Sequence, residues 1–335
     1  MIPTIFKALI VEENSEKGFS RNIKDKSTDE LPAGDVLIKV QYSTLNYKDG
    51  LSASGHKGIT RKYPHTPGVD ASGIVEESSS ELWKTGDEVI VTGYDLGMNT
   101  SGGFGQYIRV PAEWVVGKPE NMTLRNSMIY GTAGFTAGIA INELQRFEIF
   151  PETGKILVTG ATGGVGSLAV AMLSKAGYHV IASTGKKDKY EYLHKLGAKE
   201  VIDRSEVFDT SNKPLLPKRW IGAIDNVGGV TLSTVLRSTD NRGAVASIGL
   251  VESEKLDITV YPFILRGVAL IGVDSAERTM EYRLKIWERI SKEWLIENID
   301  FIVKEVGLNN LNKEIDLILK GGQCGKVLVN LWDNI

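Results

Sequence analysis

Short runs of alternating apolar and polar residues fill the first part of the chain, with few helical patterns between them. Three runs are expected to form strands, at residues 6–11, 36–44 and 88–92. Turn signals at Pro32–Asp35 and Thr85–Asp87 separate them. Closely spaced strands with few helices predict a partly closed barrel or sandwich.

From residue 126 onward, strand patterns alternate with helical patterns. The expected strands are 155–159, 179–183, 200–202, 223–226, 243–248 and 269–272. Helices are expected after the first of these, up to Ser174, and at 189–196, where Gly197 ends the pattern. This alternation predicts an α/β fold in which helices cover both faces of a parallel sheet.

The last part of the chain combines one amphipathic helix with a return to strand patterns. Apolar residues recur at helical spacing through 280–295, which is expected to pack on the sheet. Strands at 302–306 and 326–331 flank a further helix, and the simplest arrangement returns this tail to the first domain. The expected domains are residues 1–125 with 297–335, and residues 126–296. The Ser- and Glu-rich segment Glu76–Glu81 is expected to be a solvated loop.

Composition narrows the classes of partner and location. The net charge of -3 gives no reason to expect nucleic acid or an anionic membrane as a partner. No uninterrupted apolar run is long enough to span a membrane, and the first residues lack the basic-then-apolar pattern of a signal peptide. Cys324 is the single cysteine, so an intramolecular disulfide is excluded. The cytoplasm is the expected location.

The strongest chemical signal is the glycine-rich run from Val158 to Gly166, Val-Thr-Gly-Ala-Thr-Gly-Gly-Val-Gly. It follows an expected strand and opens an expected helix. Glycines in this position permit a tight turn, let backbone N–H groups approach a pyrophosphate, and let the helix lie close to the strand. The run predicts a dinucleotide site; the alternative is a purely structural turn.

The following strand ends in Ser183-Thr184-Gly185-Lys186-Lys187. An NAD-specific site usually has Asp or Glu here to bind the ribose 2′-hydroxyl group. No acid occurs before Asp188, and hydroxyl groups with two lysines suit a dianionic 2′-phosphate. The turn predicts NADPH as the cofactor; the alternative is a solvated polar turn.

Several further motifs carry a resemblance to a known superfamily. They are Asn46–Gly50, Pro67–Gly73, Gly86–Val89, Gly102–Tyr107, Tyr130–Ala137 and the glycine-rich turn. In order and spacing they resemble the medium-chain dehydrogenases/reductases. The segments Tyr261–Val268 and Gly272–Ser275 are similar to a narrower group, the YhdH/YhfP quinone oxidoreductases, which includes acrylyl-CoA reductases. The resemblance implies a GroES-like β-barrel domain, a Rossmann domain, and a homodimer made through sheet edges of the cofactor domain.

The resemblance also bears on metal binding. Zinc-dependent relatives have a Cys where Asn46 stands and a His-Glu pair where Val69-Asp70 stands, and they carry four further cysteines. This chain has one Cys and four scattered His, whereas zinc sites depend on Cys and His ligands. We therefore expect no metal.

By the same resemblance, Asn46, Tyr47 and Asp49 are the candidate catalytic residues. Asn46 would donate to a carbonyl group, Tyr47 would donate or relay a proton beside the nicotinamide, and Asp49 would orient both. The alternative is that this loop only shapes the cleft and that Asp49 caps the following helix. Asp70 is expected to stabilise a turn.

The resemblance implies a set of cofactor contacts. They are Tyr47 at the nicotinamide; Thr162, Gly163, Gly164 and Val165 at the phosphates; Thr184, Gly185 and Lys186 at the 2′-phosphate; Lys199 near the adenosine; and Leu250, Ile264, Ser275 and Lys326 at the adenine and nicotinamide ends. Lys57, Arg61 and Lys62 follow the Asn46 motif and are candidates for phosphate groups of a coenzyme A substrate.

Without zinc to polarise a carbonyl group, reduction of a C=C bond conjugated to a carbonyl is the favoured chemistry. The expected function is therefore NADPH-dependent reduction of activated C=C bonds, with acrylyl-CoA as the specific substrate. Two alternatives stay open: an NADPH:quinone oxidoreductase, and an NADPH-binding sensor with little turnover.

Overall fold

The computed structural model describes residues 4–14 and 18–333, and it contains two compact units. Unit 1 comprises Met1–Thr132, Ala276–Lys285 and Asn298–Ile335, and unit 2 comprises Ala133–Ser275 and Ile286–Glu297. The predicted division into residues 1–125 with 297–335 and residues 126–296 stays a prediction. Its outer limits, residues 1 and 335, lie outside the described residues.

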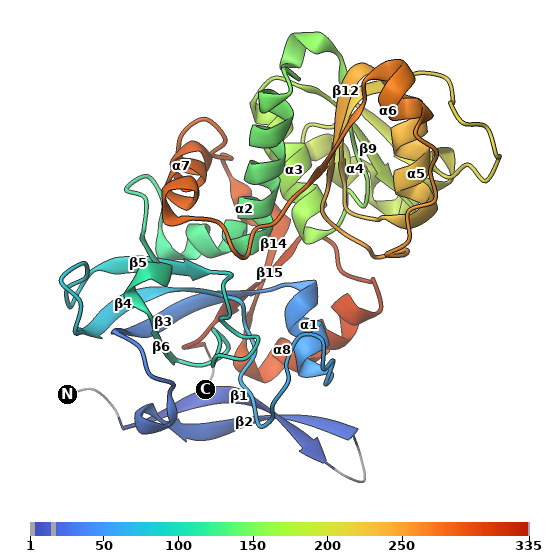
Figure 1. The fold of residues 1–335 in the computed structure, drawn as a ribbon. Helices are drawn as coiled ribbons and strands as arrows, with labels where there is room; N and C mark the ends of the chain where they lie inside the picture. Colours follow the sequence, from blue (N-terminus) through green and yellow to red (C-terminus); the bar gives the residue numbers. More distant parts are fainter. Residues whose placement is uncertain (1–3, 15–17, 334–335) are drawn as a thin grey trace. The chain divides into compact units, whose positions relative to one another are not determined.

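Unit 1 is built on a seven-stranded sheet in the order β14-β15-β3-β4-β5-β7, with β6 paired to β3 (Figure 1). Its strands are β3 (Val36–Leu45), β4 (Asp70–Ser78), β5 (Glu88–Thr92), β6 (Tyr107–Val110), β7 (Val115–Gly117), β14 (Val303–Gly307) and β15 (Lys326–Asn330). Since β15 pairs antiparallel with β3, the C-terminal residues complete a sheet that the N-terminal residues begin.

Two strand segments of unit 1 differ from expectation. A hairpin of β1 (Ile5–Asn14) and β2 (Gly18–Ser27) includes the polar strand β2, for which no strand was predicted. The prediction of a loop at Glu76–Glu81 is wrong for its first half, because Glu77 and Ser78 pair with Leu37 and Val36 of β3. In both places backbone pairing to a neighbouring strand outweighs the polar side chains.

The helices of unit 1 lie at the connections between its strands. They are η1 (Thr28–Glu30), α1 (Tyr47–Ala53), η2 (Ala112–Trp114), η6 (Ile299–Ile302) and α8 (Leu308–Leu319). The buried side chains of β3, β4 and β5 form one core with residues of α8 such as Leu311 and Ile315.

Unit 2 has a six-stranded parallel sheet in the order β10-β9-β8-β11-β12-β13. Its strands are β8 (Lys155–Val158), β9 (His179–Thr184), β10 (Glu200–Asp203), β11 (Trp220–Asp225), β12 (Thr239–Ser247) and β13 (Ala269–Gly272). The strand order reverses beside β8, which is the arrangement of a Rossmann domain and places ligands at the carboxyl ends of the strands. The predicted α/β fold, with a GroES-like domain and a Rossmann-type sheet, is confirmed.

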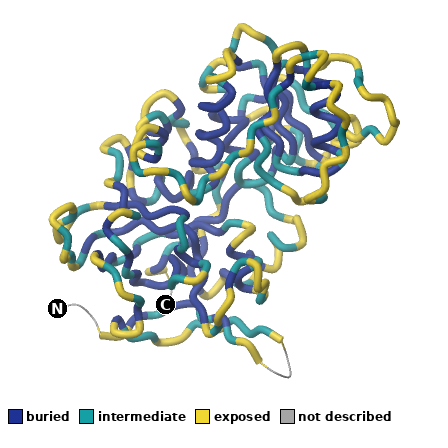
Figure 2. Tube along the Cα trace, viewed as in Figure 1, coloured by how far each residue is buried: buried dark blue, intermediate teal, exposed yellow. Residues whose placement is uncertain are grey.

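Helices surround this sheet, and its central strands β8, β9 and β11 are mostly buried (Figure 2). The helices that lie wholly in unit 2 are η3 (Pro151–Thr153), α3 (Gly164–Lys175), η4 (Lys187–Lys189), α4 (Tyr190–Lys195), η5 (Arg204–Val207), α5 (Gly229–Ser238) and α6 (Tyr261–Arg266).

Two helices cross the division between the units, α2 (Leu124–Arg146) and α7 (Met280–Ser291). Gly131 interrupts α2 with φ 46° and ψ -151°, one residue before the division. Within residues 4–14 and 18–333, no helix combines the length and the apolar character that crossing a membrane requires.

Candidate active site

The glycine-rich turn of unit 2 leaves backbone N–H groups open to a phosphate. Gly160 has φ +57°, and a Cβ atom on Gly166 would lie 2.3 Å from the Gly160 carbonyl oxygen. The helix α3 begins at Gly164, and its N-cap Gly163 has no side chain to occupy the first N–H groups. A side chain at Gly166 would therefore force the helix away from the turn, and the open helix N-terminus suits an anion.

The expected 2′-phosphate residues lie beside this turn, since β8 pairs with β9. Thr162 Oγ1 and Thr184 Oγ1 are 3.4 Å apart, and the backbone N–H of Lys186 donates to Thr184 Oγ1 at 3.1 Å. Asp188, the first acid of this segment, forms an ion pair with Lys189, and that interaction lowers its pKa. The structure therefore brings Thr162, Thr184 and Lys186 together.

Arg204, a cation that was not predicted for this site, packs against Gly185. A Cβ atom on Gly185 would be 2.7 Å from Arg204 Nε, so the Arg204 side chain occupies the space that a larger residue would fill. The parallel register pairs Thr184 of β9 with Asp203 of β10, which places the next residue, Arg204, beside Gly185. This register is the signal that identifies Arg204.

Two of the expected contacts lie away from this group. The backbone N–H of Lys199 donates to Val180 O near the start of β9, at the opposite end of the strand from Thr184. Ile264 lies on α6 with 69% of its surface exposed. The α6 helix ends at Arg266, which donates to the carbonyl oxygen of Thr239 at the amino end of β12. Neither Lys199 nor Ile264 is brought to the carboxyl edge of the sheet.

The remaining expected residues of unit 2 do follow carboxyl ends of strands. Leu250 follows β12 and Ser275 follows β13. At the end of β11, the buried carboxylate of Asp225 accepts hydrogen bonds from Thr159 Oγ1 at 2.6 Å and from the Gly228 N–H at 2.8 Å. Burial raises the pKa of Asp225 to about 6. Asp225 thereby fixes Thr159, the residue before the glycine-rich turn.

Unit 1 holds a second group of polar residues, around the start of α1. Asp49 Oδ2 accepts from the Asn46 backbone N–H at 2.7 Å, and Asp49 Oδ1 accepts from the Val69 N–H at 2.8 Å. The Asp49 carboxyl group is fully buried. It therefore caps the first turn of α1, as the alternative interpretation of Asp49 anticipated, and it also ties α1 to the segment before β4.

Asp70 connects this group to the interruption in α2. Its carboxylate accepts from Asn46 Nδ2 at 2.7 Å, from Thr132 Oγ1 at 2.6 Å, and from the Thr132 N–H at 3.0 Å. A Cβ atom on Gly131 would lie 2.8 Å from Asp70 Oδ2. The Asp70 carboxylate thus occupies the space that Gly131 leaves and caps the helical segment that begins at Thr132.

The side-chain amide of Asn46 is held on both sides. Lys326 Nζ donates to its oxygen at 3.2 Å, which fixes the amide orientation. Its Nδ2 donates to Asp70 at 2.7 Å and lies 3.2 Å from Asp49 Oδ2 and 3.3 Å from Thr44 O. Both amide hydrogens therefore have acceptors within unit 1, which leaves Tyr47 as the neighbouring donor.

Burial dominates the electrostatics of this group. Burial, and then the neighbouring Asp70 carboxylate, raise the pKa of Asp49 to about 7. Burial also raises the pKa of Asp70, against the opposing charge of Lys326. Burial lowers the pKa of Lys326 to about 8, although both carboxylates favour its charged form. Burial therefore brings the pKa values of Asp49 and Lys326 toward neutral pH from opposite sides.

Tyr47 is the first residue of α1, and its side chain is 46% exposed. Its side chain is therefore accessible to a ligand, whereas Asn46 is half-buried and Asp49 is fully buried. Among residues 4–14 and 18–333, no group of three or more His, Cys, Asp or Glu is placed to hold a metal ion.

Comparison with known proteins identifies both parts of the chain. Residues 32–120 match the model of the alcohol dehydrogenase GroES-like domain, and residues 164–292 match that of the zinc-binding dehydrogenases. The acrylyl-CoA reductase AcuI of Ruegeria pomeroyi is 42% identical over 98% of this chain and 99% of its own.

Two solved structures extend the comparison. The yhdH oxidoreductase of Salmonella enterica, in complex with NADP, superimposes with a TM-score of 0.94 at 40% identity, over 97% of this chain and 99% of its own. YhfP of Bacillus subtilis, whose name places it provisionally among the quinone oxidoreductases, is 45% identical over 98% of this chain and 99% of its own. Its structure with NAD bound has a TM-score of 0.95 at 44% identity, over 98% of this chain and all of its own.

Proposed function

The chain belongs to the YhdH/YhfP quinone oxidoreductase family of the medium-chain dehydrogenases/reductases, and from this premise we propose that it reduces the C=C bond of acrylyl-CoA with NADPH. It is an NADP-dependent oxidoreductase. The relative named acrylyl-CoA reductase matches over nearly the whole chain, and this observation carries the choice of substrate.

The cofactor assignment rests on the residues of unit 2. The glycine-rich turn and the N-terminus of α3 fit a pyrophosphate. Thr184, Lys186 and Arg204 fit the 2′-phosphate, for which Arg204 supplies a planar donor group. We assign Thr162, Gly163, Gly164 and Val165 to the phosphates, and Leu250 and Ser275 to the nicotinamide half. The proposed contacts of Lys199 and Ile264 lack this geometric support.

The proposed chemistry divides between cofactor and protein. The bound nicotinamide supplies the hydride, which adds to the β-carbon of the thioester. Negative charge then spreads to the carbonyl oxygen, where the Tyr47 hydroxyl group donates a hydrogen bond and stabilises the enolate. A proton reaches the α-carbon from Tyr47 or water. Asn46, Asp49, Asp70 and Lys326 hold the start of α1 and thereby position Tyr47.

Two other functions remain open to test. The similarity to YhfP supports an NADPH:quinone oxidoreductase as the second function. The third is an NADPH-binding sensor with little turnover. The absorbance of NADPH should be followed with acrylyl-CoA, a simple quinone and no acceptor. Rapid loss with the thioester supports the proposal, whereas loss with the quinone alone, or no turnover with any acceptor, contradicts it. Tyr47→Phe removes one donor to the enolate oxygen and should lower kcat by roughly 10²–10³-fold. Because the ring is kept, NADPH binding should stay unchanged.

We also propose a homodimer formed through β13. This strand lies at the edge of the unit 2 sheet, so no strand of the described residues pairs with the other side of its backbone. The neighbouring apolar residues are exposed, with Ile264 at 69%, Leu265 at 60% and Leu270 at 37%. An apolar sheet edge of this kind favours pairing with a second copy. A chain with one cysteine suits the cytoplasm, which is the proposed location.

A further inference from the structure

The segment that leads away from the start of α1 is rich in positive charge. Between Asn46 and Thr66 it contains four cations, Lys48, Lys57, Arg61 and Lys62, and its single acid is the buried Asp49. The whole chain has a net charge of -3. The positive segment is therefore a local departure from the charge of the protein, and it begins at the proposed catalytic residue Tyr47.

The four cations differ in their partners. Lys57 forms an ion pair with Glu13 at 2.7 Å and lies over the rings of Phe19 and Tyr63. Arg61 and Lys62 are exposed, and no described residue forms an ion pair with either side chain. The nearby Asp95 carboxylate accepts from Asn99 at 2.9 Å and from Thr100 at 3.0 Å, and it forms no ion pair with Arg61 or Lys62. Arg61 and Lys62 therefore keep charge available for an anion.

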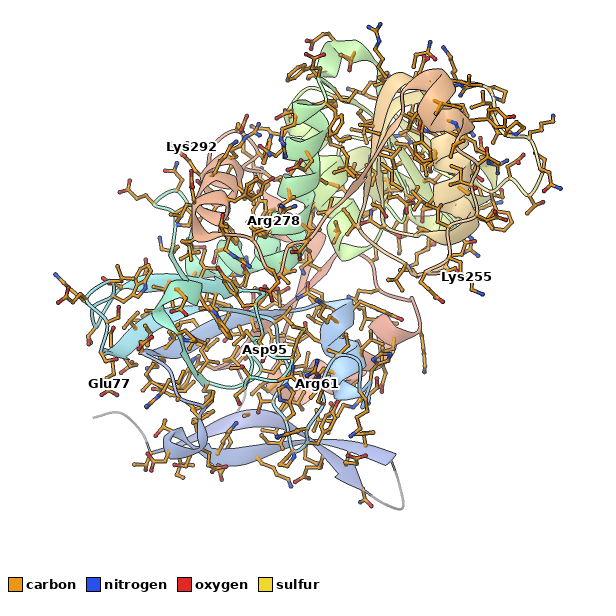
Figure 3. The ribbon with its side chains drawn as sticks, in the orientation of Figure 1. Arg61, Glu77, Asp95, Lys255, Arg278 and Lys292 are labelled. Atoms are coloured by element: carbon orange, nitrogen blue, oxygen red, sulfur yellow. The ribbon has the colours of Figure 1, made fainter. Side chains whose placement is uncertain are left out.

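The backbone around these two cations is held on both sides. Thr60, which precedes them, is buried and its hydroxyl group lies 2.7 Å from that of Ser52 in α1. Tyr63, which follows them, donates from its hydroxyl group to the Ser52 carbonyl oxygen at 2.7 Å. The Arg61 N–H donates to Asn99 Oδ1 at 3.2 Å. Figure 3 shows Arg61 in this segment beside α1. Less entropy is lost on binding when the backbone is already fixed.

We propose that Arg61 and Lys62 bind the phosphate groups of the coenzyme A portion of the substrate. This inference rests on the proposed function and deepens it, because it assigns residues to the non-reacting end of the thioester. A coenzyme A thioester carries its phosphates far from the reacting bond, at the end of the pantetheine arm. The α1 helix spans about 10 Å and joins Tyr47, at the reacting end, to the segment that holds the two cations. A small quinone has no phosphate for these residues to recognise.

The test compares Arg61→Gln/Lys62→Gln with Lys84→Gln/Lys213→Gln, a control that removes two exposed cations elsewhere. Titration of each protein–NADP complex with coenzyme A gives Kd. Acrylyl-CoA, acrylyl-pantetheine and a simple quinone then give kcat/KM. We expect the Arg61/Lys62 variant to bind coenzyme A roughly tenfold more weakly. Its kcat/KM should fall by a similar factor with acrylyl-CoA and stay unchanged with the two acceptors that lack phosphate. The control should match the wild type throughout.

Three results would overturn the inference: unchanged coenzyme A binding in the Arg61/Lys62 variant, an equal loss with all three acceptors, or no coenzyme A binding by the wild type. Failure of the proposed function is distinguishable from these. A wild type that binds coenzyme A through Arg61 and Lys62, but reduces neither thioester, would contradict acrylyl-CoA reduction and leave the phosphate site in place.

Discussion

The Arg204 side chain lies directly against Gly185, where a Cβ atom would come within 2.7 Å of its Nε atom. The two residues directly follow neighbouring strands, and the parallel register of β9 and β10 brings them together. Arg204 therefore adds a guanidinium group to the turn that holds Thr184 and Lys186. Guanidinium groups bind phosphate through paired N–H donors, so we expect Arg204 to favour a dinucleotide with a 2′-phosphate.

Replacing Arg204 should change the choice of cofactor. Arg204→Gln should weaken NADPH binding by roughly 10–100-fold, since charge-assisted hydrogen bonds contribute about 1.5–3 kcal/mol each. NADH binding should stay the same. Calorimetric titration with both cofactors measures the effect, and Lys199→Gln is the matched control because Lys199 lies at the other end of the strand. Equal weakening of NADH binding by Arg204→Gln would refute this role.

Gly131 should tolerate no side chain. Gly131→Ala would place a Cβ atom 2.7 Å from Thr44 Cγ2 and 2.8 Å from Asp70 Oδ2, at a φ of +46° that L-residues rarely adopt. We expect the free energy of unfolding to fall by about 3 kcal/mol or more. Urea unfolding measures it. Gly117→Ala makes only ordinary contacts, to Trp83 at 3.7 Å, and should change stability little. Similar losses in both variants would disprove the special constraint at Gly131.

The burial of Asp49 should appear as a pH dependence of stability. Its pKa rises from 3.8 to about 7 on folding, so folding favours the protonated acid. The stabilising contribution is fully present below about pH 4 and is lost as the pH rises through 7, by at most about 4 kcal/mol.

Asp49→Asn removes this titration while its side-chain oxygen still accepts a hydrogen bond. Urea unfolding of both proteins between pH 5 and pH 7.5, roughly the window of that pKa shift, isolates the effect. The wild type should lose stability relative to the variant across this range. A constant difference would show that Asp49 does not titrate there.

The edge strand β13 gives a prediction for assembly. Leu270→Asp places a charge at an apolar sheet edge and should convert a dimer into a monomer of 36.6 kDa. Light scattering after size-exclusion chromatography measures the mass. Leu82→Asp is the control, since Leu82 is 71% exposed on unit 1. A monomeric wild type, or a dimer that survives Leu270→Asp, would rule out this interface.

Much of unit 2 follows from local sequence. The expected strand 269–272 coincides with β13, and most other expected strands lie within one or two residues of their bounds. Buried parallel strands are short and apolar, so their own residues identify them. The polar strand β2 lacks such a signal, because its pairing depends on the ten-residue ladder to β1.

The sites were harder to predict where partners come from distant segments. Sequence reasoning found the glycine-rich turn and Thr184, because both lie within one strand–turn–helix unit. Arg204 could not be found in this way, because only the register between β9 and β10 shows that it lies beside Gly185. Likewise, the sequence suggested Asn46 as a donor to the substrate. It gave no sign that Asp70 and Lys326, from two other strands, would bind the Asn46 side chain.

The central claim is that hydride passes from NADPH to the β-carbon of acrylyl-CoA, and a deuterium label tests it most directly. Acrylyl-CoA should be reduced with NADPH that carries deuterium at the transferred position of the nicotinamide, and the propionyl-CoA formed should be analysed by NMR. The account predicts one deuterium at the β-carbon and a solvent-derived hydrogen at the α-carbon. Deuterium at the α-carbon, or no propionyl-CoA while a quinone is reduced, would contradict it.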